Sequence, residues 1–185
     1  LVICIRVKQG NQVWFVVCNR KTNEFEVTDG EGFADWFAER NAVTGGKSLR
    51  KTTRLVKYLR DIKATFSAKS VLLTTLLGNT VEDWHDQFRD HYYPDVPTAL
   101  KSIVGHLDDW LQQRPLMPAV TNPALPSETF NRHWDQEKYE NFHEKIRQYR
   151  LWIDDAYDEP DRDESIAKWR RVFGDDFAKG EVVGK

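Results

Sequence analysis

Residues 49–78 read LRKTTRLVKYLRDIKATFSAKSVLLTTLLG and carry the clearest structural pattern in the chain. The first half of this stretch has apolar side chains at the spacing of one helix face, made of Leu55, Leu59, Ile62 and Phe66. The opposite side is basic and is made of Arg50, Arg54, Lys57 and Arg60. We therefore predict an amphipathic helix over residues 49–66, with the apolar face buried and the basic face in solvent.

The second half of the stretch predicts a buried helix. Residues 71–77 are apolar on nearly every side, and Gly78 favours a helix end. Ser67 and Ser70 precede this run as candidate N-cap residues. A basic helix face beside a helix start is suited to bind phosphate, because helix N-termini present free N–H groups to an anion. A solvated basic face is the commoner interpretation of such a pattern taken alone.

Short strands precede this stretch. Residues 1–7 and 12–18 are rich in β-branched and aromatic residues and are separated by Gly10 and Asn11, which predicts a hairpin. A third strand is predicted over residues 24–28, and a short helix over residues 33–41 that turns Phe33, Trp36 and Phe37 inward. Because the strand pattern opens at Leu1, we expect further sequence upstream.

Helices dominate the rest of the chain. Their periodicity predicts segments over residues 81–91, 97–113, 135–158 and 163–173, with Gly174 as the last stop. Residues 114–127 hold four of the seven prolines and predict an extended surface loop. The expected core aromatics are Trp36, Trp84, Trp110, Trp152 and Trp169. The predicted fold class is α+β, with a few short antiparallel strands packed against a helical bundle.

Charge and composition narrow the class of protein. The 185 residues carry a formal net charge of −2, but residues 47–63 hold seven Lys or Arg against one acid. This asymmetry favours an anionic ligand near the basic segment. The two cysteines support neither a disulfide framework nor a cysteine zinc site, so a reducing cytoplasmic setting is expected. No apolar run reaches the roughly 20 residues that span a bilayer, and we expect no membrane partner.

No complete catalytic set is visible in the sequence. It contains no Gly-Lys-Ser/Thr phosphate loop, no His-Glu-x-x-His and no nucleophile elbow. His85 and His91 have poor helical spacing for joint metal ligation, and His106, His133 and His143 are scattered. We expect ordinary surface or hydrogen-bonded histidines, and no metal ligands or catalytic residues within this chain.

Several motifs in order resemble the carboxy-terminal portion of the CD-NTase family, the bacterial cGAS/DncV-like nucleotidyltransferases related to oligoadenylate synthase. Arg54-Leu-Val-Lys-Tyr-Leu-Arg60 looks like the family helix whose lysine reaches the nucleotide triphosphate, and the segment from Ser67 to Gly78 looks like the helix that follows. Pro118-Ala-Val-Thr-Asn-Pro-Ala-Leu-Pro126 is similar to the family's Asn/Asp-Pro loop. Trp169-Arg-Arg-Val-Phe-Gly-Asp-Asp-Phe177 resembles its closing motif.

The resemblance implies a two-lobed nucleotidyltransferase that makes a cyclic or linear oligonucleotide second messenger from nucleoside triphosphates, commonly in antiphage signalling. Residues 1–45 would be the remnant of the nucleotidyltransferase lobe, and residues 46–185 an oligoadenylate-synthase-like helical nucleotide-binding domain. Lys57 would neutralise the donor phosphates, and Ser70 or Ser67 would donate a hydrogen bond to them. Asn122 is a weaker nucleotide-binding candidate, with a turn-forming role as the alternative.

The family's magnesium site is expected mainly outside this chain. The resemblance implies that an amino-terminal lobe supplies the carboxylates that hold Mg²⁺ for phosphoryl transfer. A further metal-binding Asp belongs on the strand over residues 1–7, where none is present, so it lies upstream or is replaced by Ile3 or a neighbour. We expect the chain to be inactive by itself, with nucleoside triphosphates, the missing lobe and a protein regulator or effector as partners.

A second hypothesis from a different class stays open. The chain would then be a non-catalytic helical module, or a degenerate synthase, whose basic face meets an acidic protein or nucleic acid. Binding of nucleic acid that weakens steeply with salt would favour it.

Overall fold

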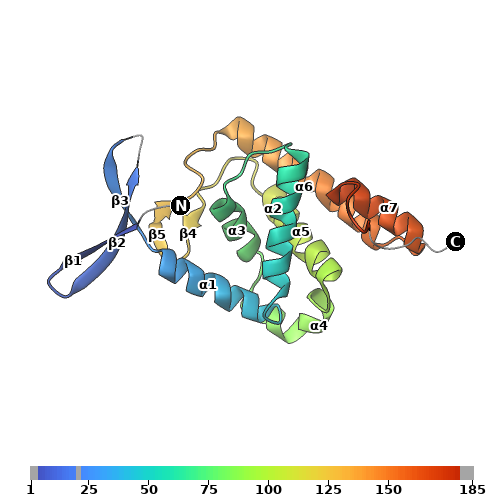
Figure 1. Cartoon of the computed structure of the whole chain (residues 1–185), viewed down its shortest axis with the longest axis horizontal. Helices are drawn as coiled ribbons and strands as arrows, with labels where there is room; N and C mark the ends of the chain where they lie inside the picture. The colour runs from blue at the N-terminus through green and yellow to red at the C-terminus, as the bar shows by residue number, and fades with distance from the viewer. Residues whose placement is uncertain (1–3, 20–21, 180–185) are drawn as a thin grey trace.

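The computed structural model describes residues 4–19 and 22–179. Strands β1 (Cys4–Gln9), β2 (Gln12–Asn19) and β3 (Glu24–Thr28) form an antiparallel sheet in the order β1-β2-β3. Gly10 has a φ of 60° in the turn, a conformation open to glycine because it lacks a Cβ. The predicted hairpin and third strand are confirmed, and the sheet projects from one side of the helical body (Figure 1).

Helices make up the body of the molecule (Figure 1). In chain order they are α1 (Gly30–Val43), α2 (Ser48–Lys63), α3 (Ser70–Gly78), the 3-10 helix η1 (Asp83–Phe88), α4 (Arg89–Tyr92), α5 (Val96–Gln112), α6 (Gln136–Tyr157) and α7 (Arg162–Phe173). The predicted α+β class is confirmed. The proposed domain boundary between residues 45 and 46 falls in the turn from α1 to α2, and the division stays a prediction.

Aspartate caps fix where four of the helices begin. The side chain at each cap accepts a hydrogen bond from a backbone N–H three residues ahead, at Asp29, Asp95, Asp135 and Asp161. Such a cap satisfies an N–H group that has no partner within the helix and stabilises by about 1 kcal/mol. Gly174, with a φ of 87°, follows α7 and ends it. The short polar residues between apolar stretches therefore set the element boundaries.

The core lies between α3, α5 and α6. Helix α3 is buried on nearly all sides, and its buried apolar residues are Leu72, Leu73, Leu76 and Leu77. This confirms the predicted buried helix. The largest fully buried side chains around it come from α5 and α6 and include Ile103, Leu107, Leu111, Tyr139, Phe142 and Tyr149. Because α3 is enclosed, the positions of its two ends are set by the surrounding helices.

The buried face of α2 differs from the predicted one. Its buried residues are Leu49, Thr52, Thr53, Val56 and Leu59. Ile62 is 39% exposed, and α2 ends at Lys63 because Ala64 adopts a left-handed conformation with a φ of 51°. Phe66 is buried, but it packs from the connection after the helix. Two threonines and Val56 thus replace the expected Ile62 in the contact with the core.

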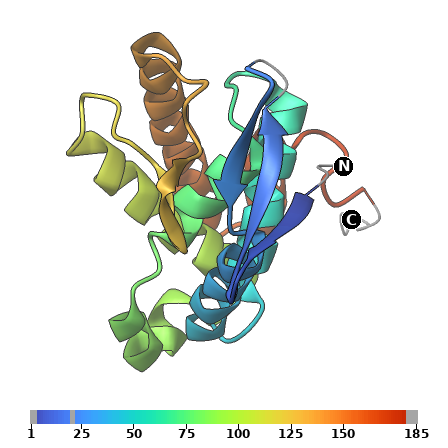
Figure 2. The ribbon, with the colours of Figure 1, turned by 90° about the vertical axis from the view of Figure 1, so that its left-hand side faces the viewer.

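Two connecting segments were also predicted wrongly. Residues 81–91 form η1 and the single-turn α4 in place of one helix. The proline-rich segment contains a two-stranded sheet of β4 (Thr121–Asn122) and β5 (Leu125–Thr129). Figure 2 shows this ribbon beside the β1–β3 sheet, and Thr28 on β3 donates a hydrogen bond of 2.9 Å to Glu128 on β5. The segment therefore joins the projecting sheet to the helical body.

The tryptophans are less buried than predicted. Trp36, Trp110, Trp152 and Trp169 are only half-buried, and Trp84 is 45% exposed. Trp134 belongs to the core, where its Nε1 donates a 2.8 Å hydrogen bond to the Ser67 carbonyl. Within the described part of the chain, no helix combines the length and apolar character needed to cross a bilayer.

Candidate nucleotide-binding site

Helix α2 carries a basic face, made of Arg50, Arg54, Lys57 and Arg60. At 100° per residue these four positions span about 120° of the helix surface and border the stripe that α2 buries. Arg50 and Arg54 are exposed, while Lys57 and Arg60 are half-buried. Among the described residues only Arg60 of this face forms an ion pair, with Asp61. Most of the positive charge on the basic face is therefore not neutralised by the protein.

Lys57 occupies the middle of the basic face. Burial lowers the pKa of the Lys57 ammonium below its ordinary value, and the positive charge of Arg60, one turn further on, lowers it further. No acid or carbonyl in the described part of the chain forms an ion pair or hydrogen bond with Lys57. A partly desolvated cation without a protein partner interacts favourably with an incoming anion.

Arg60 joins the basic face to the start of α3. Its Nη1 donates a hydrogen bond of 2.7 Å to the Ala68 carbonyl and lies 3.4 Å from Ser70 Oγ. Ser70 is the first residue of α3, and the position before it is Lys69, whose side chain does not cap the helix. The free N–H groups of the first turn of α3 thus lie close to the basic face.

The prediction that a serine caps α3 is wrong. Ser67 is exposed and lies before the helix, where its carbonyl accepts the Trp134 hydrogen bond. The two serines therefore differ in their distance from the predicted site. Ser70 contacts a residue of the basic face, and Ser67 is held by the core through its backbone.

Asn122 is not part of this constellation. It is 1% exposed, and its Nδ2 donates to the Asp29 carbonyl at 3.2 Å and to Glu128 Oε2 at 2.7 Å. Its Oδ1 accepts the Ala124 N–H at 3.0 Å. All of its polar atoms are engaged within the protein, which supports the turn-forming alternative. Asn122 fixes the β4–β5 ribbon to the N-terminus of α1.

A pocket of about 240 Å³ lies between the sheet, the start of α3 and the β4–β5 ribbon. Its polar lining includes Asp29, Lys69, Glu128, Arg132 and His133. Arg132 forms an ion pair with Glu26 at 2.5 Å, and hydrogen bonds from Asn19 and Arg132 lower the pKa of the Glu26 carboxyl. Sequence reasoning missed Lys69, Arg132 and His133 as lining residues. Lys69 lies in the segment from Ser67 to Gly78, which the sequence singled out as a helix start. No sequence pattern predicted that Arg132 and His133 would lie near it.

The described residues do not fit a magnesium ion. No group of three or more His, Cys, Asp or Glu side chains comes together within residues 4–19 and 22–179. Mg²⁺ requires oxygen ligands in near-octahedral geometry. Ile3, the position where the family resemblance places an Asp or its replacement, lies outside the described residues.

Comparisons with known proteins show which solved structures share this architecture. No family model and no curated protein matches the chain. A structure of Escherichia coli MS115-1 CdnC with ATP has a TM-score of 0.72 at 16% identity, over 95% of this chain and 59% of that chain. Vibrio cholerae di-nucleotide cyclase DncV with ATP and GTP has a TM-score of 0.67 at 19% identity, over 97% and 45%. An E. coli CdnC complex with HORMA-deltaN has a TM-score of 0.65 at 16% identity, over 89% and 55%.

The chain spans about half the length of these solved structures. At this identity the likeness concerns the fold. The match extends over nearly all of this chain, including the sheet and the helical body. This chain therefore has the fold of part of the bacterial CD-NTases CdnC and DncV.

Proposed function

We propose that this chain is the nucleotide-binding helical part of a nucleotidyltransferase that makes a cyclic or linear oligonucleotide from nucleoside triphosphates. Two of the structures that share its fold contain ATP, one of them with GTP as well. The observation that carries the proposal is the basic face of α2 beside the start of α3, since among the described residues only Arg60 of this face forms an ion pair.

The triphosphate would lie against the middle of the basic face. Lys57 would contribute charge at the donor phosphates, with Arg50 and Arg54 on adjacent turns. Ser70 Oγ and the first N–H groups of α3 would donate hydrogen bonds to phosphate oxygens, in the way that helix N-termini bind anions. Ser67 and Asn122 are not assigned this role, because each is held in a structural contact elsewhere.

The catalytic metal and the reacting groups are assigned to other parts of the protein. Mg²⁺ would supply the charge stabilisation that phosphoryl transfer needs. The carboxylates that hold it would come from a further nucleotidyltransferase lobe, since the described residues offer no such set. By this proposal the chain alone binds nucleotide weakly and is inactive.

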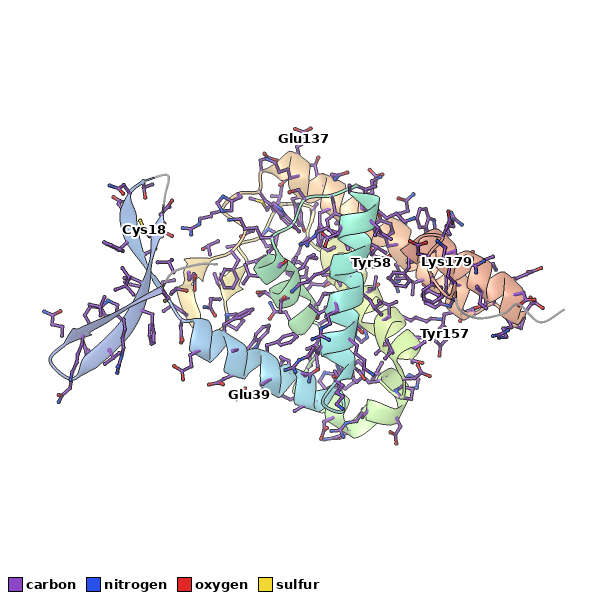
Figure 3. The ribbon with its side chains drawn as sticks, viewed as in Figure 1. Cys18, Glu39, Tyr58, Glu137, Tyr157 and Lys179 are labelled. Atoms are coloured by element: carbon purple, nitrogen blue, oxygen red, sulfur yellow. The ribbon has the colours of Figure 1, made fainter. Side chains whose placement is uncertain are left out.

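An apolar sheet face supports the existence of that lobe. Strand register places side chains on one face of the β1–β3 sheet that are nearly all apolar: Ile5, Val7, Trp14, Val16, Cys18, Phe25 and Val27. Ile5, Phe25 and Val27 are 44%, 63% and 48% exposed. Figure 3 shows Cys18 on this projecting sheet, away from the helical body. Contiguous exposed apolar surface marks an interaction site, and the remaining lobe would cover it.

The wider role is proposed by analogy alone. The synthase would act in the cytoplasm in antiphage signalling, under a protein regulator of the kind that CdnC meets in its HORMA-deltaN complex.

The thermal shift of this chain with ATP, GTP, CTP and UTP, each with Mg²⁺, tests the proposal. A nucleotide at 100 times its Kd stabilises by about 2.7 kcal/mol, which is a measurable rise in Tm. We expect Lys57→Ala to abolish the rise. Lys51→Ala is the matched control, because it removes the same charge from the same helix at an exposed position about 120° from Lys57. An equal loss in both variants would mean non-specific attraction and would contradict the site.

The non-catalytic alternative has one observation in its favour. Lys63 and Arg171 lie over the ring of Trp152, at 5.7 Å and 4.4 Å from its centroid, and Tyr58 is 45% exposed on α2 (Figure 3). Aromatic and cationic side chains together are typical of single-stranded nucleic-acid surfaces. Binding of a labelled single strand that falls steeply between 50 and 200 mM salt, with no nucleotide shift, would support this alternative.

A further inference from the structure

A pocket of about 290 Å³ lies between the end of α3, η1 and α5. None of Lys57, Ser67, Ser70 and Asn122 lines it, so it is separate from the proposed triphosphate site. Its volume is near the lower end of the range of small-molecule pockets, roughly 300–1,000 Å³. A ligand that fills it is therefore small.

Two stacked histidines form one side of the pocket. The rings of His85 and His106 lie 5.2 Å apart with an interplanar angle of 25°, although the residues belong to different elements. His85 is 2% exposed, and its Nδ1 accepts hydrogen bonds from the Tyr93 hydroxyl at 2.7 Å and the Glu82 N–H at 3.2 Å. Burial lowers the pKa of both histidines, so both rings are uncharged at neutral pH.

His106 has an unsatisfied ring nitrogen. Its Nδ1 is buried and has no hydrogen-bond partner among the described residues. The ring makes a hydrogen bond to the Thr80 backbone that raises the His106 pKa, the effect expected when an N–H donates to a carbonyl. A neutral imidazole has one donor and one acceptor nitrogen, so Nδ1 is the acceptor. A buried polar atom without a partner costs about 1–3 kcal/mol, which a donor from a ligand would relieve.

Flat aromatic surfaces line the rest of the pocket. Trp84 is 45% exposed, and its Nε1 donates a 2.9 Å hydrogen bond to Glu82. The Arg114 guanidinium lies 4.3 Å from the centre of the Trp110 ring and covers one of its faces. The indole planes are suited to stack on a planar ring.

The charges on the lining disfavour an anionic ligand. Glu82 and Asp109 both line the pocket, and its one cationic lining residue within the described chain is Arg114, stacked on Trp110. Asp109 forms an ion pair with Arg150, whereas Glu82 has none with a described residue. The Glu82 carboxylate therefore disfavours a phosphate or carboxylate ligand and favours one that donates hydrogen bonds.

We propose that this pocket binds a planar nitrogen heterocycle of nucleobase size, which stacks on the tryptophans and donates a ring N–H to His106 Nδ1. The ligand needs no phosphate, in contrast to the ligand of the basic face. The site is independent of the proposed synthase activity, because no residue of the basic face lines it and neither Ser67 nor Ser70 does.

Calorimetry with adenine and one pair of xanthines tests this site in two variants, each with a control. Adenine, used as the free base, should bind saturably, and Lys57→Ala should leave that binding unchanged. Theophylline and caffeine differ by one methyl group that replaces a ring N–H, so theophylline should bind at least about tenfold tighter, a difference of 1.4 kcal/mol. In His106→Phe, which keeps an aromatic ring but removes the acceptor, this preference should disappear.

Trp84→Ala should weaken every planar ligand about tenfold or more, and it is expected to fold because Trp84 is partly exposed. Phe88→Ala is the matched control, since Phe88 is 53% exposed next to the pocket and does not line it. The proposal is overturned if no free base or xanthine binds at millimolar concentration. It is also overturned if His106→Phe retains the preference for theophylline over caffeine.

Discussion

Arg60 on α2 donates a hydrogen bond from Nη1 to the carbonyl of Ala68, 2.7 Å away, across the turn that leads into α3. Its Nε also donates to Asp61 at 2.8 Å. A planar guanidinium can make both bonds at once because its donors form a rigid fork. Arg60 thus fixes the first turn of α3 against the basic face, which is the arrangement that the proposed phosphate site requires.

Replacement of Arg60 should therefore affect stability as well as binding. We expect Arg60→Ala to lower the free energy of unfolding by about 1.5–3 kcal/mol, the usual worth of a hydrogen bond from a charged group. Urea denaturation measures this change. Arg54→Ala, an exposed residue of the same face with no described partner, should stay within about 0.5 kcal/mol. Equal effects of the two variants would show that the bond to Ala68 contributes nothing.

The ion pair between α5 and α6 should be a second determinant of stability. Asp108 is 4% exposed, and its carboxylate accepts from Arg150 Nη1 and from Gln112 Nε2, each at 2.9 Å. Arg150→Ala would leave this buried charge with one neutral partner. We expect a loss of about 2 kcal/mol, below the 3–5 kcal/mol of a fully buried pair because the Arg150 side chain is 30% exposed.

Arg147→Ala is the control for this variant. Arg147 is exposed on the same helix and forms no ion pair with a described residue, so its removal should leave the urea midpoint unchanged. If Arg150→Ala is as stable as Arg147→Ala, the carboxylate of Asp108 is satisfied by other means.

The elements that sequence reasoning placed correctly have local determinants. Strand β3 was predicted with its observed bounds because Asn and Thr-Asp-Gly border its alternating pattern. Helix α6 was predicted within a residue of each end, since Asp135 caps it. For the site, the period of α2 was enough to group Lys57 with the arginines of the basic face.

The elements that sequence reasoning missed depend on contacts between residues that are distant in the sequence. The β4–β5 ribbon is held by Asn131, whose side chain bonds the backbone of Val120 at 3.0 Å and Pro118 at 2.7 Å. Such bonds leave no periodic signal in the chain. For the same reason nothing in the sequence predicted that His85 and His106, on different elements, would stack. Likewise, only the three-dimensional arrangement shows that no acid among the described residues pairs with Lys57.

Asn122 should prove to be a structural residue. We expect Asn122→Ala to lower the free energy of unfolding by about 2 kcal/mol, because it removes three hydrogen bonds that the buried amide makes with Asp29, Ala124 and Glu128. Below the melting temperature, the affinity of the folded variant for ATP should equal that of the unchanged chain. Calorimetric titration checks this. Loss of ATP binding at unchanged stability would instead restore Asn122 as a ligand contact.

The stacked histidines should make the fold sensitive to mild acid. Burial lowers the pKa of His85 and His106, so the unfolded chain, with histidine pKa values of about 6.5, takes up protons first as the pH falls. The contribution of the two uncharged histidines to the free energy of unfolding is therefore complete above about pH 7.5. It declines as the pH falls through about 6.5, the pKa of histidine in the unfolded chain. We expect a lower Tm at pH 5.5 than at 7.5, and a smaller decrease in His106→Phe. The exposed His91→Gln serves as the control, and a decrease as large in His106→Phe as in that control would rule out His106 as a source of the effect.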